Sequence, residues 1–271
     1  MRQIDLNWIQ KHVHPRQLDG HKKSFGHVLV IAGSEGKAGA AILCARAALH
    51  SGCGLVTAMI PSIAVEVLLK EEPALMYENV GRVQDLDLSV FDAIAIGPGL
   101  GCSEIANSNL IWLLEHYNAP LIIDADALTM LSTQLELLRS NHILTPHPGE
   151  FSKLQSAPYH ALEREAQAQY FIDKYPCTLV LKGAGTLIGV AGEGLFQNTS
   201  GNDGMATAGA GDVLTGMIAS ICAQGYTPFN AACIGVYIHG MAGDLAIKSQ
   251  SKASLVASNL IEQLGQIRLL D

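Results

Sequence analysis

The chain has 271 residues, of which 49% are hydrophobic and only 15% are charged, and its formal net charge is −8. A chain of this length can bury a large core. Its acidic balance argues against nucleic-acid binding, because phosphate backbones attract basic surfaces. The start, MRQIDLNWIQ, holds no apolar signal segment, and no apolar run approaches the roughly 20 residues of a membrane-spanning helix. We therefore expect a cytoplasmic protein with no membrane partner and no nucleic-acid partner.

The six cysteines are scattered along the chain without a C-x-x-C pair. This pattern is typical of reduced, mostly buried thiols in a cytosolic protein. Cysteines and histidines with the spacing of zinc ligands are absent, which argues against a zinc site. The ligands of any other metal ion stay unassigned.

Short apolar runs alternate with longer helical stretches along most of the chain. Strands ending in turns are predicted within residues 26–34, 54–61, 91–101, 121–128, 141–151 and 178–189. Helices are predicted at residues 39–52, 103–116 and 161–175. This alternation is typical of an α/β fold with a mostly parallel sheet covered by helices. Neither a linker nor an internal repeat divides the chain, so we expect one domain over residues 1–271.

Glycine-rich turns follow several of these strands, at the carboxyl ends where open α/β sheets bind ligands. GPGLG at residues 97–101 fits either a tight turn or a contact with a nucleotide phosphate or sugar. KGAGT at residues 182–186 fits a β-turn or a nucleotide site in which Lys182 supplies positive charge. Ala40, at the start of a predicted helix, is in a similar backbone-lined position.

Acidic and imidazole side chains occupy two further strand ends. Asp124 and Asp126 follow the apolar run LII, where they fit magnesium binding through water, substrate positioning or helix capping. In TPHPGE, two prolines stiffen the chain around His147. That setting favours a ligand contact for His147 over packing. Glu150 falls near the start of the next helix, where glutamate is a common structural device.

The most informative segment is GNDGMATAGAGD, residues 201–212, which contains four glycines and precedes the apolar run VLTGMIAS. Glycines let backbone N–H groups approach an anion closely, and a helix starting at about Asp212 would add its N-terminal dipole. The segment therefore predicts a phosphate site beside a carboxylate. The alternative is that Asp212 only caps the helix behind a flexible loop.

Seven motifs, taken together and in this order, resemble the ADP/ATP-dependent NAD(P)H-hydrate dehydratase family of the ribokinase-like superfamily. They are GHVLVIAGS, GAA…AL..G.GLVT, AIGPGLG, DADAL, TPHPGE, LKGAGT and GN.GMAT.G.GDVL.G. The resemblance runs from about Phe25 to the C-terminal helix. It implies a three-layer α/β/α sandwich with a central, mostly parallel sheet.

The resemblance also implies a repair reaction on hydrated nicotinamide coenzymes. ADP or ATP phosphorylates the C6 hydroxyl of the S epimer of NADH-hydrate or NADPH-hydrate, and loss of phosphate restores NADH or NADPH. Phosphate leaves easily where hydroxide does not. Magnesium is the expected charge-neutralising ion, and ADP is the favoured donor.

By the same resemblance, each motif receives a role. Asp212 is the catalytic base, and the amides of Gly209, Ala210 and Gly211 form the anion hole. The nucleotide contacts are Lys182, Gly183, Ala184, Gly185, Thr186 and Gly211. The hydrate contacts are Ala40, Gly101, His147 and Asp212.

The resemblance further implies a homo-oligomer. Many bacterial relatives carry an N-terminal epimerase domain, but here only about two dozen residues precede the first motif. We therefore expect no such domain and a separate NAD(P)H-hydrate epimerase as partner. Lys37 departs from the family pattern, where an apolar residue is common. Two alternatives stay open. A ribokinase-like kinase of a thiazole or pyrimidine alcohol would use the same loop and release a phosphomonoester, and a silent nucleotide-binding protein would have no use for Asp212.

Overall fold

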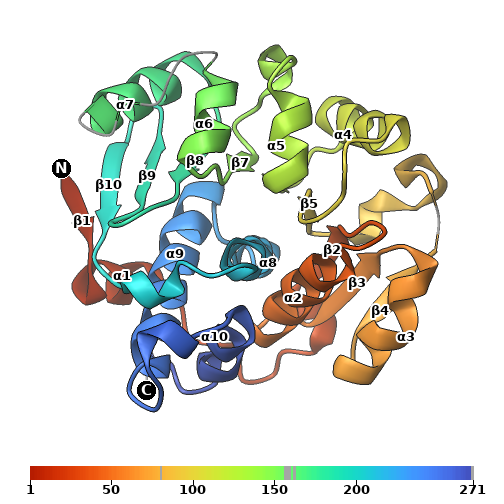
Figure 1. Ribbon diagram of the computed structural model, residues 1–271, viewed down its shortest axis with the longest axis horizontal. Coiled ribbons are helices and arrows are strands. Elements are labelled where there is room, and N and C mark those ends of the chain that lie inside the picture. The colour runs from red at the N-terminus through yellow and green to blue at the C-terminus, as the bar shows by residue number, and fades with distance from the viewer. Residues whose placement is uncertain (80, 156–159, 161–162, 270–271) are drawn as a thin grey trace.

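A mostly parallel sheet of ten strands forms the centre of the protein in the part of the chain that the computed structural model describes, residues 1–79, 81–155, 160 and 163–269 (Figure 1). The strand order is β1-β10-β9-β8-β7-β6-β5-β2-β3-β4. β9 is antiparallel to both neighbours, and the other pairs are parallel. The strands are β1 Arg2–Ile4, β2 His27–Ile31, β3 Leu55–Met59, β4 Met76–Glu78, β5 Ala93–Ile96, β6 Leu121–Ile123, β7 His142–Leu144, β8 Thr178–Leu181, β9 Leu187–Val190 and β10 Gly194–Asn198.

Both faces of the sheet are buried, as the apolar strands predict. Successive side chains of a strand point to opposite faces. In β2, Val28 and Val30 join one core cluster, whereas Leu29 and Ile31 join the other. All four side chains are at most 1% exposed.

Helices cover each face and complete the predicted three-layer α/β/α sandwich (Figure 1). One face carries α1 Leu6–His12, α2 Ala38–His50, α3 Ser62–Glu71, α8 Ala210–Ala223 and α9 Pro228–Ala246. The other carries α4 Glu104–His116, α5 Ala125–Leu131, α6 Pro148–Leu154 and α7 Arg164–Lys174. α10 Ala257–Leu264 packs on the outside of α2, α8 and α9.

Helix α8 lies deep in the molecule, with 12 of its 14 residues buried. It packs between α2 and α9 and against β2, β5 and β6. A Cβ on Gly216 would lie 2.0 Å from the carbonyl oxygen of Cys44, so α8 and α2 meet backbone to backbone. This packing holds the N-terminus of α8 rigidly at the carboxyl ends of the central strands.

Two of the predicted boundaries are wrong. The run expected as a strand to residue 128 ends as β6 at Ile123, and α5 begins at Ala125. Short apolar runs such as ADAL do not distinguish a strand from a buried helix, and here Ala127 and Leu128 are buried as helical side chains. α8 begins two residues before the expected Asp212.

The other predicted strands occur inside their predicted ranges to within one residue, and the three predicted helices begin and end within three residues of theirs. Residues 161–162 of one predicted helix lie outside the described part of the chain. All six cysteines carry free thiols, and only Cys102 is exposed. Within the described residues, no helix has both the length and the apolar character needed to cross a bilayer.

Candidate active site at the carboxyl ends of the strands

The loop over residues 201–209 ends in a glycine that starts helix α8. Gly209 has φ +86°, a left-handed conformation that other residues adopt only with strain. The first backbone N–H groups of a helix lack intrahelical acceptors. The N–H of Ala210 donates to the carbonyl oxygen of Thr207 over 3.4 Å, whereas those of Gly211 and Asp212 have no acceptor among the described residues. Two N–H groups and the helix dipole are therefore available to an anion.

Asp212 is the third residue of α8, and it does not cap the helix. The N-cap is Gly209, without a side-chain hydrogen bond, so the capping alternative is wrong. The Asp212 carboxylate has no hydrogen-bond or ion-pair partner in the described part of the chain. Burial, together with the nearby charge of Asp124, raises its pKa to about 7, although Lys182 acts in the opposite direction. Asp212 is thus suited to accept a proton near neutral pH.

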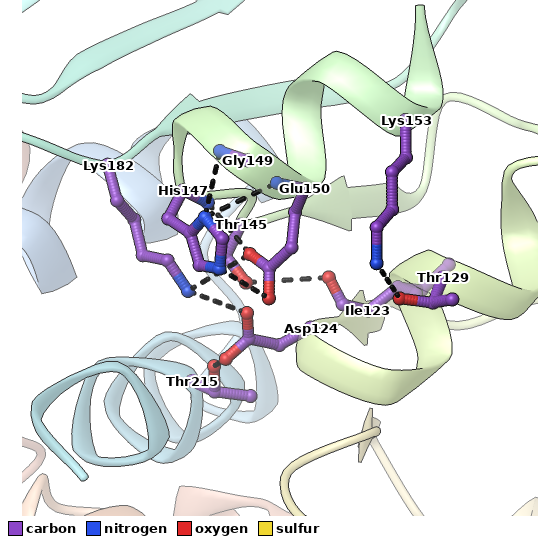
Figure 2. Close-up of polar contacts among 10 residues, drawn as sticks. All are labelled: Ile123, Asp124, Thr129, Thr145, His147, Gly149, Glu150, Lys153, Lys182 and Thr215. Atoms are coloured by element: carbon purple, nitrogen blue, oxygen red, sulfur yellow. Dashed lines mark hydrogen bonds and ion pairs between the residues drawn. The ribbon is translucent and has the colours of Figure 1, made fainter. Parts of the chain in front are cut away.

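An ion-pair network lies next to the start of α8 (Figure 2). Lys182, at the end of β8, donates through Nζ to Oδ1 of Asp124 over 2.8 Å, and Oε2 of Glu150 is 3.9 Å from the same Nζ. Burial alone would lower the pKa of Lys182, but these carboxylates outweigh it and raise the pKa. A Cβ on Gly211 would lie 3.2 Å from this Nζ. The ammonium group therefore stands beside the free N–H groups of α8.

Asp124 is buried, with 1% of its surface exposed, and its second oxygen is also occupied. Thr215, one turn into α8, donates through Oγ1 to Oδ2 of Asp124 over 2.7 Å. Each oxygen of Asp124 accepts one of these hydrogen bonds. The Asp124 side chain therefore holds Lys182 and α8 in place. Of its three predicted roles, capping of α5 does not occur, because no side-chain cap bond forms.

His147 forms the N-cap of α6 with Glu150. Its Nδ1 accepts from the N–H groups of Gly149 (3.0 Å) and Glu150 (3.3 Å), while Oε2 of Glu150 accepts from the His147 N–H over 2.8 Å (Figure 2). Because Nδ1 accepts, the proton resides on Nε2. Structural capping therefore explains part of the TPHPGE motif. The imidazole is still 57% exposed, which leaves its outer edge accessible to a ligand.

The predicted hydrate contacts are Ala40, in the first turn of α2, and Gly101, in the turn that follows β5. Asp126 links the two turns: its Oδ2 accepts from the Gly101 N–H over 2.8 Å and from Lys37 Nζ over 3.1 Å. A Cβ on Gly99 would lie 3.0 Å from the Cβ of Ala40. Lys37 is thus tied to Asp126 at the rim of this region.

The turn over residues 182–186 is stabilised from two sides. Thr186 donates through Oγ1 to the carbonyl oxygen of Gly183 over 3.0 Å. Arg164 on α7 donates to the carbonyl oxygens of Leu181 (3.0 Å) and Ala184 (2.8 Å). The turn is therefore shaped before any nucleotide binds, and its predicted nucleotide contacts stay predictions.

The described residues contain no group of three or more histidine, cysteine, aspartate or glutamate side chains that could hold a metal ion. Asp124 is engaged by Lys182 and Thr215, and Asp126 by Lys37 and Gly101, which leaves Asp212 as a single carboxylate without a partner beside them. These residues do not fit a resident magnesium ion held by the protein alone.

Sequence reasoning missed four residues that shape the site. They are Arg164, Thr215, His239 and Asp244. Arg164 and Thr215 carry no sequence signal of their own. His239 and Asp244 flank Gly240 and Gly243 in HGMAGD, and polar residues around two glycines in an apolar helix are a detectable sign of close backbone approach.

Replacing Gly209 by alanine is expected to destabilise the protein by about 2 kcal/mol, from the strain of the left-handed conformation. The new Cβ would also lie 2.5 Å from Cδ1 of Leu43. Urea unfolding measures the change. Gly265→Ala is the matched control, because its Cβ meets nothing within 4 Å. Equal stability of the two variants would contradict the assigned conformation of Gly209.

Comparison with known proteins shows which family the chain belongs to. The sequence profile of the NAD(P)H-hydrate dehydratase family matches residues 28–266. The ADP-dependent (S)-NAD(P)H-hydrate dehydratase of Neisseria meningitidis serogroup B is 38% identical over 251 residues, which cover 88% of this chain and 83% of the relative. The chain spans about half the length of the bifunctional NAD(P)H-hydrate repair enzymes that it also matches.

Solved structures agree with this result. A ribokinase-like superfamily protein from Enterococcus faecalis superimposes with a TM-score of 0.88 at 31% identity, covering 98% of this chain and 94% of the other. The ADP/ATP-dependent NAD(P)H-hydrate dehydratase of Bacillus subtilis, co-crystallised with ATP and Mg²⁺, gives 0.85 at 27% identity, covering 98% and 96%. The family profile, the relative from N. meningitidis and the solved structures all agree. The chain therefore belongs to the NAD(P)H-hydrate dehydratase family.

Proposed function

We propose that this protein is an ADP-dependent dehydratase that repairs hydrated nicotinamide coenzymes. It converts the S epimer of NADH-hydrate or NADPH-hydrate to NADH or NADPH and releases AMP and phosphate. One observation carries the proposal: the unpartnered Asp212 carboxylate, with a pKa of about 7, adjoins the free N–H groups at the start of α8. The relative from N. meningitidis, named as ADP-dependent, supports ADP over ATP as donor.

The first chemical step is phosphoryl transfer. Asp212 takes the proton of the C6 hydroxyl, whose oxygen attacks the β-phosphorus of ADP while the bond to AMP breaks. Negative charge on the moving phosphoryl group is met by the N–H groups of Gly211 and Asp212, by Lys182 and by the helix dipole. All of these donors are in place before the reaction, so little reorganisation is needed as the charge moves.

The second step is elimination. The lone pair of the ring nitrogen expels phosphate from C6, and loss of a proton from C5 restores the ring double bond. Phosphate leaves far more readily than hydroxide, which is why the reaction consumes a phosphoryl donor. In this account the protein positions the reactants and stabilises charge, while the coenzyme's own nitrogen supplies the electrons.

The ligands occupy opposite sides of Asp212 in this proposal. Lys182, Gly183, Ala184, Gly185, Thr186 and Gly211 contact the nucleotide, and Ala40, Gly101, His147 and Asp212 contact the hydrate. Gly209, Ala210 and Gly211 surround the anion, with the Gly211 N–H as its main donor. Magnesium would enter with the nucleotide and would neutralise phosphate charge.

Three further proposals concern the domain content, the cellular location and the oligomeric state of the protein. Residues 1–271 act as one dehydratase unit, and epimer interconversion comes from an epimerase unit outside these residues. Free thiols support a reducing, cytoplasmic setting.

Apolar side chains exposed beside edge strand β4, including Ile63, Val67 and Met76, offer a surface for a homo-oligomer.

The proposed function is tested by adding the protein to NADH-hydrate, magnesium and ADP. We expect the absorbance of reduced nicotinamide to rise, with one AMP and one inorganic phosphate released for each NADH. Repeating the assay with ATP decides the donor. Failure to form NADH with either donor would overturn the proposal, and a phosphomonoester formed from a vitamin-precursor alcohol would favour a kinase of the same fold.

The pH dependence follows from the raised pKa of Asp212. Below about pH 7 the carboxylate is protonated in the folded protein and cannot accept the hydroxyl proton, so activity is expected to fall as pH decreases. Well below this pKa of the free enzyme, kcat/KM should drop about tenfold for each pH unit. Initial rates across this range measure the effect. A rate that stays constant down to about pH 5 would contradict the role of Asp212 as base.

A further inference from the structure

The peptide unit that joins Ala210 to Gly211 receives support from outside its own helix. Nε2 of His239 on α9 lies 2.9 Å from the carbonyl oxygen of Ala210. A carbonyl oxygen has no proton to give, so the imidazole is the donor and its proton resides on Nε2. This contact crosses from α9 to the first residue of α8.

The carbonyl of Ala210 and the N–H of Gly211 belong to the same peptide unit. Because that unit is planar and trans, the two groups point in opposite directions. A hydrogen bond accepted by the carbonyl therefore acts with the helical backbone of α8 to fix the direction of the N–H, and it also polarises the N–H into a stronger donor. A Cβ on Gly211 would lie 3.2 Å from Nζ of Lys182, so Gly211 and the ammonium group are neighbours at the anion site.

Other residues of α9 hold the opposite end of the glycine-rich loop. Asp244 accepts from the N–H of Gly201 over 2.8 Å and from Nδ2 of Asn202 over 2.9 Å. Between these residues and His239, a Cβ on Gly240 would lie 2.2 Å from Oγ of Ser200, so only glycine admits the loop there. The segment from His239 to Asp244 thus supports the loop at both ends.

The imidazole serves as a neutral donor. Burial, together with the charge of Lys182, lowers the pKa of His239 to about 4, against the opposing effect of the bond to Ala210. At pH 7 the ring adds no positive charge beside Lys182. It does not compete with the lysine for the phosphates.

We infer that His239 is a positioning residue for phosphoryl transfer, because its Nε2–H aligns the Ala210–Gly211 peptide so that the Gly211 N–H faces the transferred group. This inference rests on the proposed function of the same site. His239 does not touch the substrate, so its effect is expected on the transition state rather than on binding.

The test compares His239→Gln, whose amide nitrogen keeps a donor at similar reach, with His239→Met, which keeps the reach and loses the donor. We expect His239→Met to lower kcat by about 10- to 100-fold, less than the loss of a whole oxyanion-hole donor, with KM for ADP and for the hydrate nearly unchanged. His239→Gln should recover most of kcat. His116→Met, an exposed histidine on the distant helix α4, is the matched control.

Thermal unfolding shows whether each variant folds, and His239→Asn, whose amide is too short to reach Ala210, replaces His239→Met if that variant does not. Wild-type kcat in the donor-free variant would overturn the inference, as would a folded His239→Gln no faster than His239→Met. In both cases the wild type still forms NADH, so the proposed function stands. A wild type that forms no NADH overturns the proposed function together with this inference.

Discussion

Asp212→Asn is expected to lower kcat for NADH formation by about 10³-fold, within the range of about 10² to 10⁴ typical for loss of a general base. The amide cannot accept the hydroxyl proton, although it fills the same space. Steady-state rates with saturating ADP measure the loss. Asp203→Asn is the matched control, since Asp203 is in the same loop and 81% exposed, paired with Lys252 at the surface. Wild-type kcat in Asp212→Asn would remove this residue from the mechanism.

The same substitution separates catalysis from folding. The pKa of Asp212 is raised above its ordinary value of 3.8 to about 7, so the ionised carboxylate is disfavoured in the folded state. The stability associated with this group is present at low pH and is lost as pH rises through about 7. Asp212→Asn should therefore raise the melting temperature, and more at pH 8 than at pH 5. An inactive variant that is also more stable cannot owe its defect to unfolding.

Lys182→Met is expected to lower the free energy of unfolding by about 3–5 kcal/mol, the usual cost of removing one partner of a buried ion pair. The substitution leaves Asp124, 1% exposed, without its cation. Urea unfolding measures the loss, and the rate with ADP should fall as well. Lys153→Met is the control, since that lysine is near Thr129 on the exposed side of α6 (Figure 2).

A second substitution sharpens this test. Asp124→Asn removes the uncompensated charge, so the double variant should regain much of the stability lost in Lys182→Met while staying impaired with ADP. Non-additive free energies of this kind identify a direct interaction between the two side chains. Additive losses would contradict the central place of the Lys182–Asp124 pair.

The fold could be predicted from the sequence because its strands are apolar on both faces and alternate with helices. Hydrophobic pattern also located Lys182 and His147 at strand ends, and the glycine-rich loop located Asp212 at the start of a helix. These patterns could not reveal which partners these side chains find. The pairing of Lys182 with Asp124 spans 58 positions, and that of Thr215 with Asp124 spans 91, so both depend on the packed sheet.

The local sequence around His147 and Asp212 did not reveal their structural roles correctly. The prolines around His147 favoured ligand binding, yet the ring caps α6 as well, because a histidine Nδ1 can accept from backbone N–H groups as an aspartate does. Asp212 was open to interpretation as a cap, and only the left-handed conformation of Gly209 shows that the helix starts earlier. The HGMAGD pattern indicates close backbone approach around His239, but it could not reveal the contact with Ala210, because that contact joins two separate helices that pack side by side.

The most direct test of phosphoryl transfer follows the oxygen of the C6 hydroxyl of the hydrate. NADH-hydrate carrying ¹⁸O in its C6 hydroxyl is converted with ADP, and the products are analysed by mass spectrometry. Because that oxygen attacks the β-phosphorus and then leaves with it, the label is expected in inorganic phosphate. Label released as water, with unlabelled phosphate, would contradict phosphoryl transfer to the hydrate.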